Sequence, residues 1–228
     1  MPRPSITLSG ETLDRARIEA LLAGEAMLVF EDCDFSGADL SRLNLQETTV
    51  FQCTLLETSL YAANLSRTRW KRCRAGHADF ESAELVDAQL TASDLNNTSW
   101  RRARLASSSF RSCKLTGAAF DDVSYLGLSF EDCLLIGADL RRMSFRKQTL
   151  VRLDFADADL SGCDFRDAVF QGGSLRAAHI KDTRFEGADL RQADLGGIRL
   201  LNAKLFADAT ISPRQAAEIV RTLGLNVA

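Results

Sequence analysis

The sequence has no apolar run approaching the ~20 residues that a membrane-spanning helix needs. Its first ten residues, Met1 to Gly10, also lack the charged and apolar blocks of a signal peptide. No association with a membrane is therefore expected. These absences predict a soluble cytoplasmic protein.

Residues suited to catalysis or metal binding are scarce or unsuitably spaced. His77 and His179 are the only two histidines and lie far apart. The six cysteines form no Cys-x-x-Cys or Cys/His cluster of the kind that zinc sites use. Serine and aspartate are plentiful, but no nucleophile stands out beside a base. The sequence predicts no catalytic, metal-binding or cofactor-binding residue, no cofactor, and no enzyme.

Charge of one sign does not dominate either. The formal net charge is −3 and the pI is near 5.5, so the basic stripe of a nucleic-acid binder is not expected, nor is direct nucleic-acid binding. Charge instead alternates along the chain in short bands. A basic band is followed by an acidic one: Arg69, Lys71, Arg72 and Arg74, then Asp79, Glu81, Glu84 and Asp87. Such bands keep a surface soluble or meet a partner of complementary charge.

What the sequence does contain is a period of five. Every position divisible by five from Phe30 to Leu205 holds a core-type apolar residue, and Ala75 is the only small one. This period matches neither the 3.6 residues of a helix nor the 2 of a strand. Because it continues without a phase slip, it predicts a single repeat domain whose core is built by stacking.

We call the apolar residue at each position divisible by five the centre of its pentapeptide. The position two residues before each centre selects small side chains. It is most often alanine, and all six cysteines occupy it: Cys33, Cys53, Cys73, Cys113, Cys133 and Cys163. Cysteine in this phase behaves as a small hydrophobic residue. We therefore expect reduced, buried and metal-free thiols, stacked in columns if one coil consists of four pentapeptides.

The commonest unit reads Ala-Asp-Leu or Ala-Asp-Phe, as at residues 38–40, 78–80, 138–140, 158–160, 188–190 and 193–195. This unit resembles the pentapeptide-repeat family. The resemblance implies an all-β solenoid, a right-handed quadrilateral β-helix with one pentapeptide on each side. It implies about nine coils, with short helical caps at both ends.

Both ends depart from the repeat, which divides the chain into residues 1–25, 26–207 and 208–228. The first segment has helical spacing from Ser9 to Ala23, with Ser9, Gly10 or Thr12 as the start. In the last segment, Ser212 precedes Pro213 as an N-cap, and Gly224 offers a left-handed stop. The first segment is interpreted as an N-terminal cap, and the last as a capping and dimerisation helix with a tail.

Two sets of residues are predicted to make contacts with proteins. A homodimer through the C-terminal end would use Ile219, Val220, Leu223, Leu225 and Val227. A candidate partner surface combines outward apolar and acidic residues: Leu126, Leu134, Ile136, Asp121, Asp122, Glu131 and Asp132. A second outward apolar group is formed by Phe51, Leu56 and Tyr61.

Two functions remain in competition. One is a non-enzymatic, protein-binding β-helix scaffold whose partner is unknown. The other follows from resemblance to the quinolone-resistance members of the family, which mimic DNA and protect DNA gyrase and topoisomerase IV from quinolones and other poisons. The C-terminal Leu223-Gly224-Leu225 resembles the segment through which those members dimerise. The chain departs from them in lacking the strongly acidic face that a DNA mimic needs.

Overall fold

The computed structural model describes residues 4–24, 26–198, 203–222, 224 and 226–227. The chain forms two compact units, residues 1–134 and 135–228. Each unit is a stack of coils, and each is described by itself.

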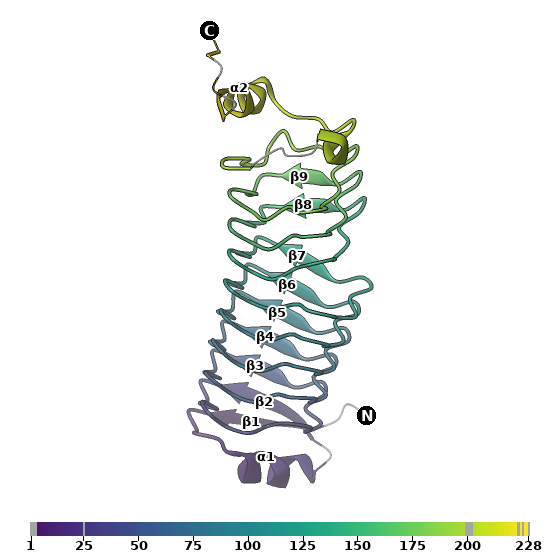
Figure 1. Cartoon of the computed structure of the whole chain (residues 1–228). Helices are drawn as coiled ribbons and strands as arrows, with labels where there is room; N and C mark the ends of the chain where they lie inside the picture. Colours follow the sequence, from purple (N-terminus) through teal and green to yellow (C-terminus); the bar gives the residue numbers. More distant parts are fainter. Residues whose placement is uncertain (1–3, 25, 199–202, 223, 225, 228) are drawn as a thin grey trace. The chain divides into compact units, whose positions relative to one another are not determined.

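The first unit contains seven parallel strands on one side of its coils (Figure 1). They are β1 (Ser5–Ser9), β2 (Met27–Glu31), β3 (Thr49–Phe51), β4 (Arg69–Lys71), β5 (Gln89–Thr91), β6 (Ser109–Arg111) and β7 (Ser129–Glu131). From β2 onward, each residue pairs with the one four pentapeptides later, as Phe30 with Val50 and Val50 with Trp70. The second unit contains the parallel pair β8 (Thr149–Val151) and β9 (Val169–Gln171), with the same spacing.

The other three sides of each coil pair through single parallel bridges. In the first unit these join Asp34 to Thr54, Asp39 to Ser59 and Asn44 to Asn64. One strand side and three bridge sides complete a coil of four pentapeptides, so each pentapeptide forms one side. The predicted four-sided β-helix is thus confirmed; the described residues make about eight turns, where about nine coils were predicted.

The predicted inward residues fill the interior of the coils. Phe80 stacks on Trp100 with ring centroids 4.1 Å apart, and Trp100 stacks on Phe120 at 5.9 Å. All three are at most 1% exposed. Among the described centres up to Leu195, only Tyr125 and Ile180 are half-buried rather than buried. The period of five therefore identifies the core almost completely.

The corners lie two residues after the centres, and from Asp32 to Gly187 all of them adopt left-handed backbone angles. Gly117 has a φ of 67°, as the relaxed limits of glycine allow. Residues with side chains take the same angles, for example Arg72 at 57° and Asp87 at 60°. The corner conformation is therefore imposed by the coil and does not require glycine.

The N-terminal end differs from the prediction in two ways. Strand β1 pairs with β2 and places Leu8 beside Phe30, a rung outside the period of five. Helix α1 spans Arg15–Leu22 and begins after Asp14, whose side chain accepts a hydrogen bond from Arg17 N. The predicted starts at Ser9, Gly10 and Thr12 were wrong, because residues up to Thr12 continue the β-pairing. The helix contributes Ile18 to the buried core.

The repeat slips by one residue near the end of the second unit. In the regular repeat, the backbone N of a centre donates a hydrogen bond to the carbonyl O of the residue that precedes the equivalent centre on the next coil, as from Phe165 N to Arg184 O. Phe185 N instead donates to Leu205 O, one residue further along the chain than this pattern predicts. As a result, Phe206 at the end of the 3₁₀ helix η1 (Ala203–Phe206) stacks on Phe185 at 4.8 Å. The inward position predicted for Leu205 was therefore wrong. The preceding centre, Leu200, lies outside the described residues.

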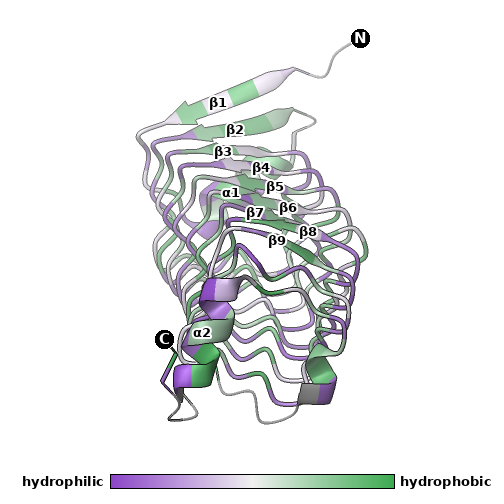
Figure 2. Ribbon diagram, turned by 90° about the horizontal axis from the view of Figure 1, so that it is seen from above, coloured by the Kyte–Doolittle hydropathy of each residue, from purple (hydrophilic) through white to green (hydrophobic). Residues whose placement is uncertain are grey.

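Helix α2 (Pro213–Thr222) follows in the second unit, with hydrophilic and hydrophobic residues on its turns (Figure 2). Ser212 Oγ accepts a hydrogen bond from Gln215 N, and Gln215 Oε1 accepts one from Ser212 N. This reciprocal capping box confirms Ser212 as the N-cap. Gly224 has a φ of 81°, as expected for a left-handed stop. Within the described residues, no helix has the length and apolar character to cross a membrane.

Candidate functional site

Neither histidine belongs to a catalytic arrangement. His77 is exposed, and its Nε2 lies 3.4 Å from Asn97 Nδ2. His179 is also exposed. Across residues 4–24, 26–198 and the described C-terminal positions, no three His, Cys, Asp or Glu side chains gather as metal ligands.

The six cysteines are free thiols, each at most 1% exposed, as the small-residue phase predicts. Their thiols donate to backbone carbonyls, for example Cys163 Sγ to Leu140 O at 3.0 Å. Burial raises the pKa of Cys53 and of Cys163 to about 12. The hydrogen bond with Cys133, together with burial, raises the pKa of Cys113. Because the thiolate is the reactive form, the raised pKa values make Cys53, Cys113 and Cys163 poorly suited to nucleophilic or redox chemistry.

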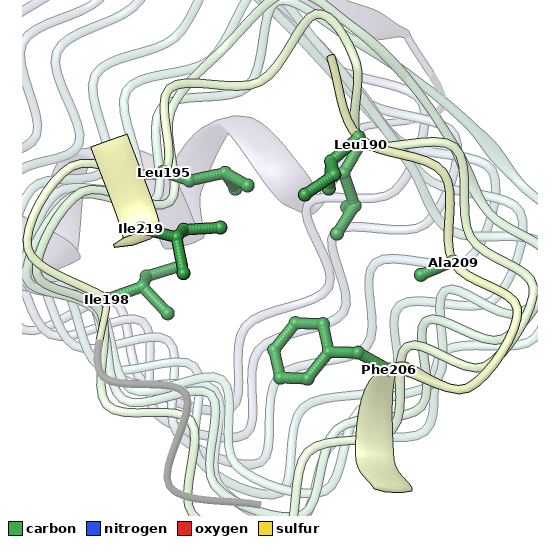
Figure 3. Close-up of a pocket in the computed structure, with 7 residues that line it drawn as sticks. Leu190, Leu195, Ile198, Phe206, Ala209 and Ile219 are labelled. Atoms are coloured by element: carbon green, nitrogen blue, oxygen red, sulfur yellow. The ribbon is translucent and has the colours of Figure 1, made fainter. Parts of the chain in front are cut away.

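The second unit has an apolar pocket of about 130 Å³ near its C-terminal end (Figure 3). Its lining combines the last coil, the end of η1, the segment after it and helix α2: Leu190, Leu195, Ile198, Phe206, Ala209, Ile211 and Ile219. Every lining side chain is apolar, so nothing in it would orient a polar substrate. Sequence reasoning missed the pocket because the slip brings Phe206 rather than Leu205 inward.

Gln215 attaches helix α2 to the end of the coil. Its side chain is buried, and its Nε2 donates to Leu190 O and Ala193 O, both at 2.7 Å. Leu190 O also accepts a hydrogen bond from Ala193 N, whereas no other hydrogen bond to Ala193 O is found among the described residues, so Gln215 supplies a donor to a backbone acceptor at the end of the ladder. The signal for this role was Gln three residues after Ser212, which is typical of a capping box.

The predicted dimerisation residues have different surroundings. Ile219 lines the pocket and so faces the coil of its own chain, whereas Val220 is half-buried and Val227 is 39% exposed. Leu223 and Leu225 lie outside the described residues. Dimerisation through this end stays a prediction.

The residues of the candidate partner surface lie at several corners. In the first unit, Asp121 and Asp122 follow Phe120, Leu126 follows Tyr125, and Glu131 and Asp132 follow Phe130, on three successive sides of the coil. Leu126 is 87% exposed and Leu134 is 38% exposed. Ile136 belongs to the second unit and is half-buried. The acidic residues therefore do not form one face, and this surface stays a prediction.

Several charged side chains of the first unit form ion pairs between adjacent coils. Arg67 pairs with Glu47 at 2.7 Å, Arg104 with Glu84 at 3.1 Å, and Arg111 with Glu131 at 2.8 Å. The partners of each pair occupy equivalent positions on adjacent coils. Exposed pairs of this kind contribute roughly 0–1 kcal/mol each. Where they form, these pairs neutralise the outward charge locally.

Sequence comparison accounts for the repeat. The family model for a pentapeptide repeat region matches residues 28–100, and that for pentapeptide repeats in eight copies matches residues 83–122, 129–167 and 158–197. The chain belongs to the pentapeptide-repeat family. No curated protein sequence matches it.

Solved structures of pentapeptide-repeat proteins share the fold. A trypsin-treated variant of QnrB1, a plasmid-mediated fluoroquinolone resistance protein, superposes with a TM-score of 0.68 at 19% identity, over 99% of both chains. A second trypsin-treated QnrB1 variant gives 0.58 at 17% identity, over 98% of this chain and 99% of the other. HetL, a protein involved in the regulation of heterocyst differentiation from the cyanobacterium Nostoc, gives 0.43 at 22% identity, over 90% and 85%. At these identities the likeness to the two QnrB1 structures shows the pentapeptide-repeat fold alone.

Proposed function

We propose that this chain is a non-enzymatic β-helix that binds a protein partner through its outward side chains. The observation that supports this is the filling of the interior. Leu60, Phe80 and Trp100 are 0% exposed, so the coil presents only its outward positions to other molecules. Burial raises the pKa of the Cys53 and Cys163 thiols, and the two exposed histidines lie far apart in the sequence, so recognition rather than chemistry is the role that fits these residues.

A second candidate is protection of a type II topoisomerase. The similarity to QnrB1 over 99% of both chains favours it, since that protein confers fluoroquinolone resistance. The charge distribution weighs against it, because DNA carries one negative charge per ~1.7 Å and a mimic needs a continuous acidic face. In the first unit, acidic residues alternate with Arg67, Arg104 and Arg111, with which they pair.

A DNA gyrase supercoiling assay separates the two candidates. We expect the purified chain to leave supercoiling unchanged, both without a quinolone and with one at an inhibitory concentration. Restored supercoiling and fewer cleavage complexes in the presence of the drug would replace the general proposal by topoisomerase protection. A heat-unfolded sample at equal concentration controls for non-specific protein effects.

We also propose that two copies join through the C-terminal end. Val220 is a half-buried residue of α2 that does not line the pocket, and Val227 is exposed beyond it. A two-fold contact there would cover both in each subunit. Val220→Asp should convert the dimer to a monomer in light scattering, whereas Arg214→Asp, at a position 89% exposed on the same helix, should not. A parent that is monomeric at tens of micromolar contradicts the proposal.

A further inference from the structure

One area of the first unit carries acidic and basic side chains that do not pair between adjacent coils, unlike Arg67 with Glu47 or Arg104 with Glu84. Three consecutive coils carry an acidic row, a neutral row and a basic row across the same corner. The rows are Glu31, Asp32 and Asp34; Phe51, Gln52 and Thr54; and Lys71, Arg72 and Arg74. We call these nine residues the three-row surface.

The register places the rows in columns. Glu31, Phe51 and Lys71 are directly paired positions on β2, β3 and β4, and the bridges join Asp34 to Thr54 and Thr54 to Arg74. Adjacent parallel strands lie about 4.8 Å apart, so the acidic and basic rows are separated by about 10 Å. In every column an acid stands on one side of a neutral residue and a base on the other.

These charges have no ion-pair partner among the described residues. The pairs of the first unit use other side chains, such as Arg67 with Glu47, Arg102 with Glu81 and Arg104 with Glu84. The three acids and three bases are therefore left for an external partner. Five of the six are exposed, and Glu31 is half-buried.

The middle row supplies apolar area between the charged rows. Phe51 points outward beside Lys71 and is half-buried, and Leu56 in the same coil is 36% exposed. An apolar centre flanked by charges is the usual arrangement of a protein contact. A nucleic acid would meet the acidic row as well as the basic one, so it fits this surface poorly.

We infer that the three-row surface binds the same surface of a second copy of this chain. A two-fold axis along the Phe51–Thr54 row reverses the order of the rows but keeps each column aligned. Glu31 would then face the copy's Lys71, Asp32 its Arg72, and Asp34 its Arg74, each twice by symmetry. Phe51 would face its own counterpart. Such a contact is isologous, because one patch serves both subunits.

The neighbouring rows allow this arrangement. The row beyond the basic one contains Thr91, Ala92 and Asp94, and the row beyond the acidic one contains Ser9, Gly10 and Thr12. In the two-fold pair, the stacks of coils of the two copies run in opposite directions, so these two outer rows would meet. Asp94 would then face Thr12 of the copy rather than an acid. No like charges are opposed across the five rows, so the register is specified by charge as well as by Phe51.

The test exchanges the charged rows between two variants. The all-acidic variant is Lys71→Glu with Arg72→Glu, and the all-basic variant is Glu31→Lys with Asp32→Lys. For each variant alone, the Kd of self-association at low salt should rise at least about tenfold, because four favourable charge pairs per dimer become repulsive. Mixed in equal amounts, they should associate with a Kd within about threefold of the parent, since every pair becomes opposite again.

Analytical ultracentrifugation with one variant fluorescently labelled measures all the pairings. The control is Arg42→Glu with Arg101→Glu, which makes the same charge change on another side of the coil and should behave as the parent. Any C-terminal contact contributes equally to every pairing, so the difference between mixed and unmixed samples reports the three-row surface alone. Circular dichroism melts confirm that each variant is folded.

Two outcomes overturn the inference. One is a mixed sample that associates no more tightly than the all-acidic variant alone. The other is a parent whose self-association at low salt is unchanged by either pair of substitutions. Neither outcome bears on binding of a different protein, so the proposed function is judged separately by its own assay.

Discussion

Phe120→Asp should destabilise the protein severely, lowering the free energy of unfolding by more than about 4 kcal/mol. Phe120 is 1% exposed, and its ring contacts those of Trp100, Phe110 and Phe130. The substitution removes three ring contacts and leaves a carboxylate with no partner in a dry interior. Urea denaturation followed by tryptophan fluorescence measures the change.

Ser99→Asp is the matched control for this prediction. It introduces the same charge at an outward position, where the bridge partner on the preceding coil is already Asp79. We expect the free energy of unfolding of this variant to stay within about 0.5 kcal/mol of that of the parent. If the Phe120→Asp variant unfolds at the same urea concentration as the parent, the inward assignment of this residue is wrong.

Deleting a single residue from the middle of the first unit should be as damaging as burying a charge. Removal of Asp87, an exposed corner residue, would move every later inward side chain of the unit out of phase with the coils before it. Between residues 26 and 134 no loop separates the sides to absorb the shift, because each coil pairs with the next at equivalent positions. We expect the free energy of unfolding to fall by at least about 3 kcal/mol.

The control is a larger deletion that keeps the phase. Removing residues 88–107 joins Asp87 to Ser108 and takes out one whole coil, so the flanking coils can pair in register. This shorter protein should give a cooperative thermal melt and a parallel-β circular dichroism spectrum. A single-residue deletion that melts like the parent, or a whole-coil deletion that fails to fold, would show that the coil is not the unit of folding.

The period of five predicts the interior because each side of the coil repeats one environment. Buried centres such as Leu60 and Phe80, and buried thiols such as Cys113, follow from that single rule. The two tryptophans illustrate a second pattern in the sequence. Trp70 and Trp100 donate their indole N–H to Thr68 and Thr98, which occupy the small-residue position two before each centre. A buried indole needs an acceptor, and threonine supplies one there.

The ends could not be read from the period because they are set by what covers the last backbone groups. β1 pairs with β2 at a wider spacing than the later strands use, as Ser5 with Met27, and the segment before Phe206 contains one residue more than the repeat allows. Each adjustment occurs once, at a terminal coil, so neither produces a repeating pattern in the sequence. The three-row surface was hidden for a related reason. Its acids and bases lie two coils apart along the chain, and they share a corner only once the coil is known to consist of four pentapeptides.

The left-handed corners divide this molecule into two kinds of position with different freedom to vary. A side chain at such a corner costs about 1–2 kcal/mol relative to ordinary backbone, whichever L-residue supplies it. Arginine, aspartate and alanine all occur there, as at Arg72, Asp32 and Ala62. Since the conformational penalty is nearly the same for each, exchanging one charge for another at a corner changes what the surface recognises while leaving the interior intact. Binding specificity can therefore diverge at the corners at little expense to the fold.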